Sequence, residues 1–360
     1  MPSKTLIGYA IQSCETMIKK FKSARDLPPK SRFHYHQGVF LSGMYKTYSI
    51  CKDERYFQYI KDWLDSVVAE DGTPIGQVGI QMDDMQPGIL LYPMIDKYND
   101  PKYKKAIDFL VNQFKDYPIN ETGGLWHKDI YPNQMWLDGL YMGGPLLAEY
   151  ASRYNSPKYI DFVITQIKTM RKYTQDAKTN LWYHAWDESK REKWSNPITG
   201  QSPEFWGRSI GWVPVAILDV LDFVCPQHPE YKYIVQILTD LIEAICKYQS
   251  HQGRWYQVVD KGDGEGNWLE TSCSCLFVAA ICKAHRKGLI DDKYLEYAKK
   301  GFDGVIDSLE YDGEDILINN VCVGTGVGDY AHYINRPTST NDLHGVGAFL
   351  LMCVEGELAL

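Results

Sequence analysis

Residues 126–145 read WHKDIYPNQMWLDGLYMGGP, a polar and aromatic connection that runs into an almost wholly apolar helical segment. Asp138 lies within this segment, directly after Trp136 and Leu137. Burying an unpaired carboxylate is costly, so this residue is either paired for structural reasons or placed at a cavity where it does chemistry. The pattern of a long connection followed by an apolar helix recurs along the chain, and it predicts both the fold and the role of Asp138.

Apolar periodicity and helix stop signals predict twelve helices. Some, such as 53–69, carry one apolar stripe and one charged face, as half-exposed helices do. Others, such as 134–152, 203–223 and 269–286, are apolar almost all round and suit helices packed on both sides. The twelve segments are 2–22, 36–51, 53–69, 84–98, 102–115, 134–152, 156–174, 203–223, 229–248, 269–286, 291–308 and 341–357.

Short and long connections alternate between these segments. Every long connection runs from a half-exposed helix into an apolar one: 22–36, 69–84, 115–134, 174–203, 248–269 and 308–341. In a ring of six helical hairpins the long connections would gather at one end, around the N-termini of the inner helices, and a site is expected there. The sequence therefore predicts an all-α fold, an (α/α)6 barrel or six-hairpin toroid, with residues 1–360 as a single domain. An open solenoid is the competing architecture, but no fixed-period repeat is found.

Composition limits the classes of partner and compartment. The formal net charge of -8 over 360 residues argues against a nucleic acid or an acidic membrane as the main partner. Nine cysteines are scattered along the chain, and the sequence has no Cys-x-x-Cys or His-Glu-x-x-His motif, which argues against a zinc site. The N-terminal stretch lacks the apolar core of a secretion signal, so we expect a cytoplasmic protein.

Polar and aromatic residues gather in the long connections or in the first turn after them. Flat apolar faces of sugars stack on aromatic rings while polar side chains satisfy the hydroxyls, so this mixture predicts a carbohydrate site. The stretches are 33–37, 81–88, 126–128 with Trp136 and Asp138, 182–187, 205–208 with Trp212, 268–271 and 324–330.

Structural explanations compete at several of these positions. Asp83 or Asp84 could be a helix cap, with the other one functional. His127 and His184 could be buried structural histidines, and Arg208 could pair with an internal carboxylate as readily as with a ligand anion. The glycines of 324–330 are best explained by a turn. From the residues alone we expect an enzyme that uses Asp138 with Asp83 or Asp84 as a carboxylate pair.

An ordered set of motifs resembles glycoside hydrolase family 105, the unsaturated rhamnogalacturonyl hydrolases, over nearly the whole chain. Its most specific parts are Phe-Trp-Gly-Arg-x-x-Gly-Trp at 205–212 and Trp-x-Asp at 136–138. Phe33 stands where a tryptophan is expected and Asp84 where the family often has another residue. The remaining motifs are 33–38, Met82-Asp83-x-x-x-Pro87-Gly88, 124–127, His184-x-Trp186-Asp187, Trp194 with Gly200, and 270–272.

The resemblance implies an (α/α)6 barrel and a metal-free reaction without a cofactor. The substrate is a small oligosaccharide that carries a 4,5-unsaturated galacturonic residue at its non-reducing end, and the enzyme hydrates the vinyl ether of that residue. Asp138 would donate a proton to C4 and then, as a base, activate the water that attacks C5. A partly desolvated carboxyl with a raised pKa suits these two steps.

The resemblance also implies roles for other side chains. Asp83 is the second important carboxylate, and Arg208 with Lys128 would hold the uronate carboxylate. Tyr35, His127 and His184 would bond sugar hydroxyls, while Trp136 contributes to substrate binding and Trp206 and Trp212 would stack on the sugar. We expect a monomer or weak homo-oligomer that binds neither nucleic acid nor a membrane.

Two alternatives remain open at this stage. A family 88 enzyme would act on unsaturated glucuronyl ends of glycosaminoglycan fragments, but sulfated substrates call for more basic residues than Arg254 and Lys261 in the 248–269 connection. A catalytically silent sugar-binding protein on the same scaffold would not need Asp138, Asp83, His184 and Arg208 intact. A terpene-cyclase-like barrel is disfavoured, because the acidic run at 83–84 is too short to bind magnesium in that way.

Overall fold

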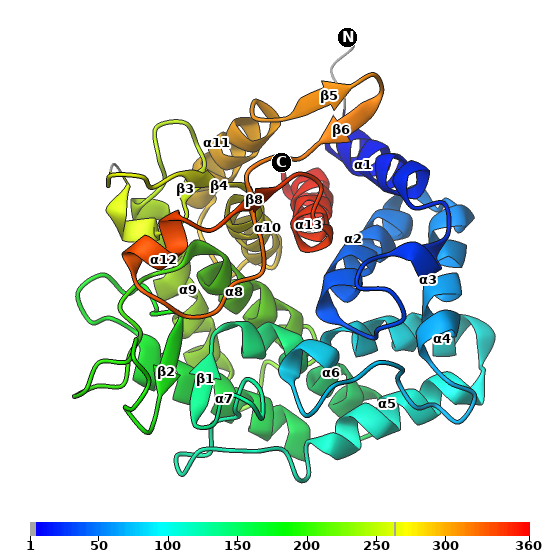
Figure 1. Ribbon diagram of the computed structural model, residues 1–360, viewed down its shortest axis with the longest axis horizontal. Coiled ribbons are helices and arrows are strands. Elements are labelled where there is room, and N and C mark those ends of the chain that lie inside the picture. The colour runs from blue at the N-terminus through cyan, green and yellow to red at the C-terminus, as the bar shows by residue number, and fades with distance from the viewer. Residues whose placement is uncertain (1–4, 263) are drawn as a thin grey trace.

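Two concentric rings of helices build the computed structural model, which describes residues 5–262 and 264–360 (Figure 1). The outer ring consists of α1 (Leu6–Lys20), α3 (Glu54–Val67), α5 (Pro101–Gln113), α7 (Lys158–Thr174), α9 (Tyr231–Lys247) and α11 (Leu295–Ile306). The inner ring consists of α2 (Tyr35–Cys51), α4 (Leu91–Tyr98), α6 (Asp138–Arg153), α8 (Gly207–Leu221), α10 (Thr271–Arg286) and α13 (Leu343–Ala359). These helices correspond one to one to the twelve predicted segments, although residues 2–4 of the first segment lie outside the described residues.

The two rings differ in burial as their sequences predict. In outer helix α3 the buried positions, among them Tyr56, Ile60, Trp63 and Val67, recur at helical spacing along one face. Inner helix α8 buries every residue except Asp219, because it packs against neighbours on both sides. Burial of inner helices such as α8 and α10 on several sides supplies a large share of the apolar core.

The inner ring closes on itself. Each inner helix contacts the next, with the 3-10 turn Gln86–Leu90 joining α4 to α2 and α6, and α13 packs against both α10 and α2. Glycines allow the close approach at the last contact: a Cβ atom on Gly347 of α13 would come within 2.5 Å of the Val39 carbonyl oxygen on α2. The first and last inner helices therefore meet, as in an (α/α)6 barrel and not an open solenoid.

The long connections contain short strands that the sequence analysis did not predict. Four antiparallel pairs form: β1 (Gln134–Trp136) with β2 (Ala185–Asp187), β3 (Trp255–Tyr256) with β4 (Leu269–Glu270), β5 (Glu310–Asp312) with β6 (Asp315–Leu317), and β7 (Val321–Cys322) with β8 (Thr338–Ser339). These pairs satisfy backbone groups that would otherwise lack partners in buried connections. A short helix, α12 (Tyr330–Ile334), lies in the connection that precedes α13.

Two helices begin later in the chain than predicted, because other secondary structure precedes them. Strand β1 takes the first residues of the predicted segment 134–152, so α6 begins at Asp138 itself and not a turn earlier. The predicted segment 84–98 is helical only over α4, and the residues before it form 3-10 turns around Pro87. None of the helices in the described residues combines the length and apolar character needed to span a membrane.

Candidate active site

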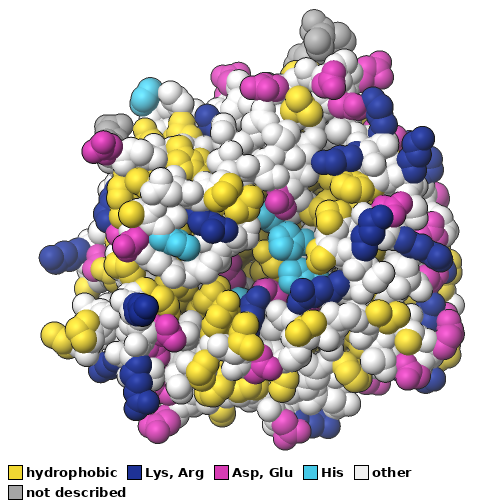
Figure 2. Space-filling view, viewed as in Figure 1, with side chains coloured by type: hydrophobic (Ala, Val, Ile, Leu, Met, Phe, Trp, Pro, Cys, Tyr) yellow, Lys and Arg dark blue, Asp and Glu magenta, His cyan; other side chains and the backbone are white. Residues whose placement is uncertain are grey.

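A cavity of about 270 Å³ opens at the loop-rich end of the barrel. Figure 2 shows the hollow near the centre of this face, with histidine and basic side chains at its edge. Its volume lies near the lower end of the range of roughly 300–1,000 Å³ that is usual for small-ligand sites. The lining residues are His34, Tyr35, His36, Asp83, His127, Lys128, Tyr131, Trp136, Asp138, Met142, Trp206, Arg208, Trp212, Gly324, Thr325, Gly326 and Arg336.

Asp138 is the first residue of α6, and its side chain is 14% exposed in the cavity wall. The pairing of Trp136 with Ala185 in the β1–β2 ladder brings the next connection alongside, and Leu137 donates its backbone N–H to the His184 carbonyl at 3.0 Å. As a result, Nε2 of His184 lies 3.3 Å from Oδ2 of Asp138. The helix N-terminus adds a favourable field for a carboxylate at this position.

The partners of His184 determine where its proton lies. The Tyr333 hydroxyl is 2.7 Å from His184 Nδ1 and accepts the backbone N–H of Gly328 at 3.3 Å. Since the hydroxyl oxygen is already accepting a hydrogen bond from Gly328, its own hydrogen is free to be donated to Nδ1. The neutral imidazole then carries its proton on Nε2 and directs it toward Asp138.

The pKa of Asp138 differs from the sequence-based expectation. Burial raises the pKa of this carboxyl, but His184, His127 and Arg208 together outweigh burial and hold the pKa below its ordinary value. Asp138 is therefore ionised at neutral pH in the protein without substrate, and the expectation of a raised pKa is wrong for this state. The carboxyl has close cationic and hydrogen-bonding neighbours, which the local sequence does not reveal.

Asp83 lines the same cavity as Asp138 and lies within a cluster of basic side chains. Its carboxylate contacts Lys128 Nζ at 2.6 Å, His127 Nε2 at 3.5 Å and His34 Nε2 at 3.9 Å. Burial would raise the pKa of Asp83, but His127, Lys128 and His34 lower it to about 2. Burial in turn lowers the pKa of His127 and of His34 to about 4, so both imidazoles are neutral at pH 7.

Asp84 points away from this cluster and does not line the cavity. Its carboxylate accepts a hydrogen bond from Gln81 Nε2 at 2.9 Å and lies 3.7 Å from Arg32. Burial, with a further contribution from Asp83, raises the pKa of Asp84 to about 7. Neither carboxylate caps a helix, because the 3-10 turn Met82–Asp84 has no side-chain cap. The sequence leaves Asp83 and Asp84 as alternatives, and of the two Asp83 is the one that lines the cavity.

Aromatic rings form one side of the cavity. Trp136 stacks on His127 and on Tyr131, with ring centroids 4.5 Å and 5.0 Å apart. Trp212 lines the cavity and stacks on Tyr141 behind it at 4.4 Å. These contacts fix the rings in place, which suits a surface for stacking a sugar.

Arg208 pairs with backbone carbonyls and not with an internal carboxylate. It donates hydrogen bonds to the carbonyl oxygens of Cys322 and Val323, and its guanidinium lies over the Trp206 ring, 4.4 Å from the centroid. These bonds tie α8 to the segment that leads into Gly324–Gly326 in the cavity wall. Among the residues that the structure describes, no carboxylate forms an ion pair with this cationic group at the cavity.

Nine of the ten predicted site residues line this cavity: Tyr35, Asp83, His127, Lys128, Trp136, Asp138, Trp206, Arg208 and Trp212. His184 does not, because it is fully buried behind Asp138, so its predicted contact with sugar hydroxyls gives way to a contact with the carboxylate. The sequence analysis missed Tyr131, Met142, Tyr333 and Arg336. Tyr131 and Met142 both lie within residues 126–145, the stretch that contains Trp136 and Asp138, whereas Tyr333 and Arg336 carry no local signal.

Comparison with known proteins places this geometry in a family. The model of Glycosyl Hydrolase Family 88 matches residues 9–360. A glycoside hydrolase of family 105 from Clostridium acetobutylicum, whose structure is solved, is 34% identical, with a TM-score of 0.92 over 96% of this chain and 98% of that chain. The unsaturated rhamnogalacturonyl hydrolase YesR from Bacillus subtilis is 26% identical over 296 residues, which are 81% of this chain and 79% of that protein.

A more distant structure shares the architecture alone. The unsaturated glucuronyl hydrolase of Bacillus sp. GL1, which degrades glycosaminoglycan, is 14% identical, with a TM-score of 0.70 over 97% of this chain and 95% of that chain. The (α/α)6 barrel is therefore common to enzymes of both groups, and sequence identity separates them. The chain belongs to Glycosyl Hydrolase Family 88 as its family model defines it and, through its close likeness to the Clostridium enzyme, to glycoside hydrolase family 105.

Proposed function

We propose that this enzyme removes a 4,5-unsaturated galacturonic residue from the non-reducing end of rhamnogalacturonan oligosaccharides by hydrating its double bond. The observation that carries the proposal is the pair formed by Asp138 and His184 in the wall of a polar, aromatic cavity. The likeness to YesR, an unsaturated rhamnogalacturonyl hydrolase, supports the choice of substrate class.

In the proposed reaction Asp138 gives a proton to C4 of the vinyl ether, and positive charge develops at C5. The carboxylate that remains takes a proton from water, whose oxygen bonds to C5 and forms a hemiketal. The hemiketal opens at the ring oxygen, and the aldehyde at C1 forms as the remaining sugar departs. One group serves as acid and then as base, so Asp138 returns to its starting state.

The lowered pKa of Asp138 makes substrate binding part of this mechanism. The substrate brings a carboxylate into the cavity and displaces water, and both changes raise the pKa of a neighbouring carboxyl. Arg208 and Lys128 are placed to receive the uronate carboxylate, and Lys128 is shared with Asp83. We infer that Asp138 acquires its proton as the substrate binds and not before.

His184 and Tyr333 act as positioning residues in this account. The Tyr333 hydroxyl holds Nδ1 of His184, so Nε2 presents its hydrogen to Asp138 in the ionised state and helps to orient the carboxylate. Asp83 stays ionised beside Lys128 and His127 and binds sugar hydroxyls and the attacking water. Tyr35, His127, Trp136, Trp206 and Trp212 complete the sugar-binding wall.

The direct test is an absorbance assay with an unsaturated galacturonyl-rhamnose disaccharide. The conjugated double bond absorbs ultraviolet light, so hydration removes the signal as rhamnose is released. We expect the wild-type protein to abolish the absorbance and folded Asp138→Asn to leave it nearly unchanged. Steady absorbance with the wild type, combined with turnover of an unsaturated glucuronyl disaccharide, would assign the enzyme to the glycosaminoglycan group instead.

A further inference from the structure

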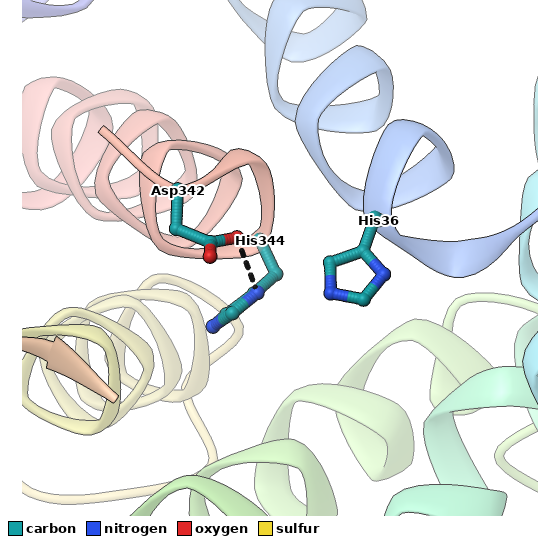
Figure 3. Close-up of side chains that lie close together, drawn as sticks. All are labelled: His36, Asp342 and His344. Carbon is teal, nitrogen blue, oxygen red and sulfur yellow. Dashed lines mark ion pairs between the residues drawn. The ribbon is translucent and has the colours of Figure 1, made fainter. Parts of the chain in front are cut away.

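Three metal-ligand side chains converge where the first and last inner helices meet. His36 lies in the first turn of α2, Asp342 directly precedes α13, and His344 lies in the first turn of α13. One ligand atom from each residue lies within 4.8 Å of the other two. Figure 3 shows the His36 ring, the Asp342 carboxylate and the His344 ring turned toward a common point between the two helices.

Hydrogen bonds outside the cluster fix the proton on His344. Its Nε2 lies 3.0 Å from the Cys322 carbonyl oxygen, which can only accept a hydrogen bond, so the proton lies on Nε2. In the neutral ring, Nδ1 is then a bare lone pair. This Nδ1 is fully buried and lies 2.8 Å from Asp342 Oδ1, which is hydrogen-bonding distance, and it has no other partner among the residues that the structure describes.

His36 is arranged in the same way. Its Nδ1 lies 3.1 Å from Nδ1 of His34, and His34 Nδ1 also accepts the backbone N–H of His36. Because His34 Nδ1 accepts, the proton between the two rings belongs to His36 Nδ1. The remaining nitrogen of His36, Nε2, is therefore a lone pair that faces the cluster (Figure 3).

Two imidazole nitrogens and a carboxylate thus converge on one point, where a divalent cation can take the place of a proton shared by His344 and Asp342. We propose that His36, Asp342 and His344 form a binding site for a divalent transition-metal ion of the zinc class. Two nitrogen ligands and one carboxylate favour such an ion over magnesium or calcium, which prefer oxygen. The Cys322 carbonyl and His34 hold the outer nitrogens of the two imidazoles, as is usual for histidines that bind metals.

The cluster has room to close and a path for entry. Ligand atoms around a tetrahedral ion at 2.0–2.1 Å are about 3.3 Å apart, so His36 closes the remaining gap by turning about its side-chain bonds. His36 lines the cavity described above, which gives an ion access from solvent.

An ion at this point would join the N-terminal turns of α2 and α13 across the seam where the barrel closes. It would bind the folded state alone, because residues 36 and 342–344 come together only on folding, and it would therefore raise the melting temperature. The ion would therefore stabilise the fold, and it takes no part in the reaction at Asp138. The inference is independent of the proposed substrate.

The test uses Zn²⁺ with protein that has been stripped by a chelator. We expect one Zn²⁺ per chain by calorimetry and a rise in melting temperature that equal Mg²⁺ does not produce. His36→Gln and His344→Gln should each weaken binding at least tenfold. His285→Gln is the matched control, because His285 contacts Asp292 at 2.8 Å in an exposed pair with no third ligand, and it should bind as the wild type does.

Co²⁺ provides a readout on the wild type that does not depend on the folding of any variant. We expect a visible spectrum of nitrogen and oxygen ligation, without an intense sulfur-to-cobalt band, that Zn²⁺ abolishes at one equivalent. A sulfur band would place the ion at the cysteines and overturn the proposal. The absence of any Zn²⁺ effect on the melting temperature, or equal binding by His36→Gln, would overturn it as well and leave a proton between His344 and Asp342.

Discussion

Nε2 of His184 lies 3.3 Å from Oδ2 of Asp138, and the Tyr333 hydroxyl lies 2.7 Å from the other nitrogen of the same ring. Tyr333 belongs to α12, His184 directly precedes β2 and Asp138 begins α6, so the three residues meet only in the folded barrel. This row of contacts stabilises the ionised form of Asp138, and the pH dependence of the enzyme follows from it.

The first prediction concerns the pKa of Asp138 in the free and bound enzyme. General-acid catalysis needs the protonated carboxyl, so activity falls as the pH rises through its pKa. In the free enzyme this pKa is lowered, whereas the bound uronate raises it. The profile of kcat/KM should therefore lose activity at lower pH than the profile of kcat, by at least about one unit.

Steady-state kinetics between pH 4 and 8 test this: kcat/KM should decline across the whole range, because the free-enzyme pKa lies below the ordinary value of 3.8, whereas kcat should show its inflection inside the range. The same inflection in both profiles would mean that substrate binding does not protonate Asp138. A control with Asp84→Asn, which leaves the cavity wall intact, should show the same separation as the wild type.

Asp83 and Asp84 form a matched pair for mutation. Asp83→Asn should reduce kcat/KM by roughly 100-fold or more, because it removes an ionised group from the cavity and leaves Lys128 without its partner. Asp84→Asn should change kcat/KM by less than about threefold, because the residue lies outside the cavity wall. Equal losses in the two variants would contradict the assignment of Asp83.

Tyr333→Phe tests whether the hydroxyl acts through His184. Without it the His184 proton can shift to Nδ1, which turns a lone pair toward the Asp138 carboxylate and destabilises the ionised form. We expect a fall in kcat of about tenfold and a shift of the kcat/KM profile toward higher pH, with little change in KM. A loss of active protein with an unshifted pH profile would indicate a purely structural role.

The buried histidines predict sensitivity to acid. The pKa of His127 is lowered to about 4, so the folded state keeps this ring neutral while the unfolded chain binds a proton near pH 6.5. The neutral ring imposes no penalty above pH 6.5, and stability is lost as the pH falls from there through about 4. The full loss amounts to about 3 kcal/mol for one such group.

Urea unfolding at pH 7, 5.5 and 4.5 measures this loss. His127→Gln cannot be protonated, so the difference in stability between the wild type and this variant should shrink as the pH falls. His228→Gln is a suitable comparison, because His228 is partly exposed beside Asp161. A constant difference between the wild type and His127→Gln would show that the pKa of His127 is the same in the folded and the unfolded chain.

Much of the fold and site was predictable because it depends on local pattern. The alternation of half-exposed and apolar helices, with a long connection before each apolar one, is enough to place six hairpins in a ring. The same alternation places Asp138, Asp83 and Arg208 at one end. The short strands were not predictable, because two- or three-residue pairs depend on which connections lie side by side in the folded barrel.

The partners of Asp138 escaped prediction for a similar reason. Tyr333 is 149 residues from His184 and lies in a five-residue helix with no apolar periodicity. The pKa of Asp138 depends on His184, His127 and Arg208, which belong to two different connections and to helix α8. An apolar sequence context suggested a raised pKa because it shows burial and hides these neighbours. The sequence analysis did not single out Asp342 and His344, because the Asp-x-His pattern indicates a metal site only when the fold brings His36 next to it.

The most direct test of the central claim is the fate of the solvent hydrogen during turnover in D₂O. Hydration of the double bond transfers one deuteron from Asp138 to a single face of C4, whereas direct hydrolysis of the glycosidic bond adds none there. Early product is analysed by NMR beside product incubated without enzyme, which reports exchange. We predict one stereospecific deuterium at C4 in every turnover. A deuterium content at C4 no higher than in the product incubated without enzyme would contradict hydration of the double bond.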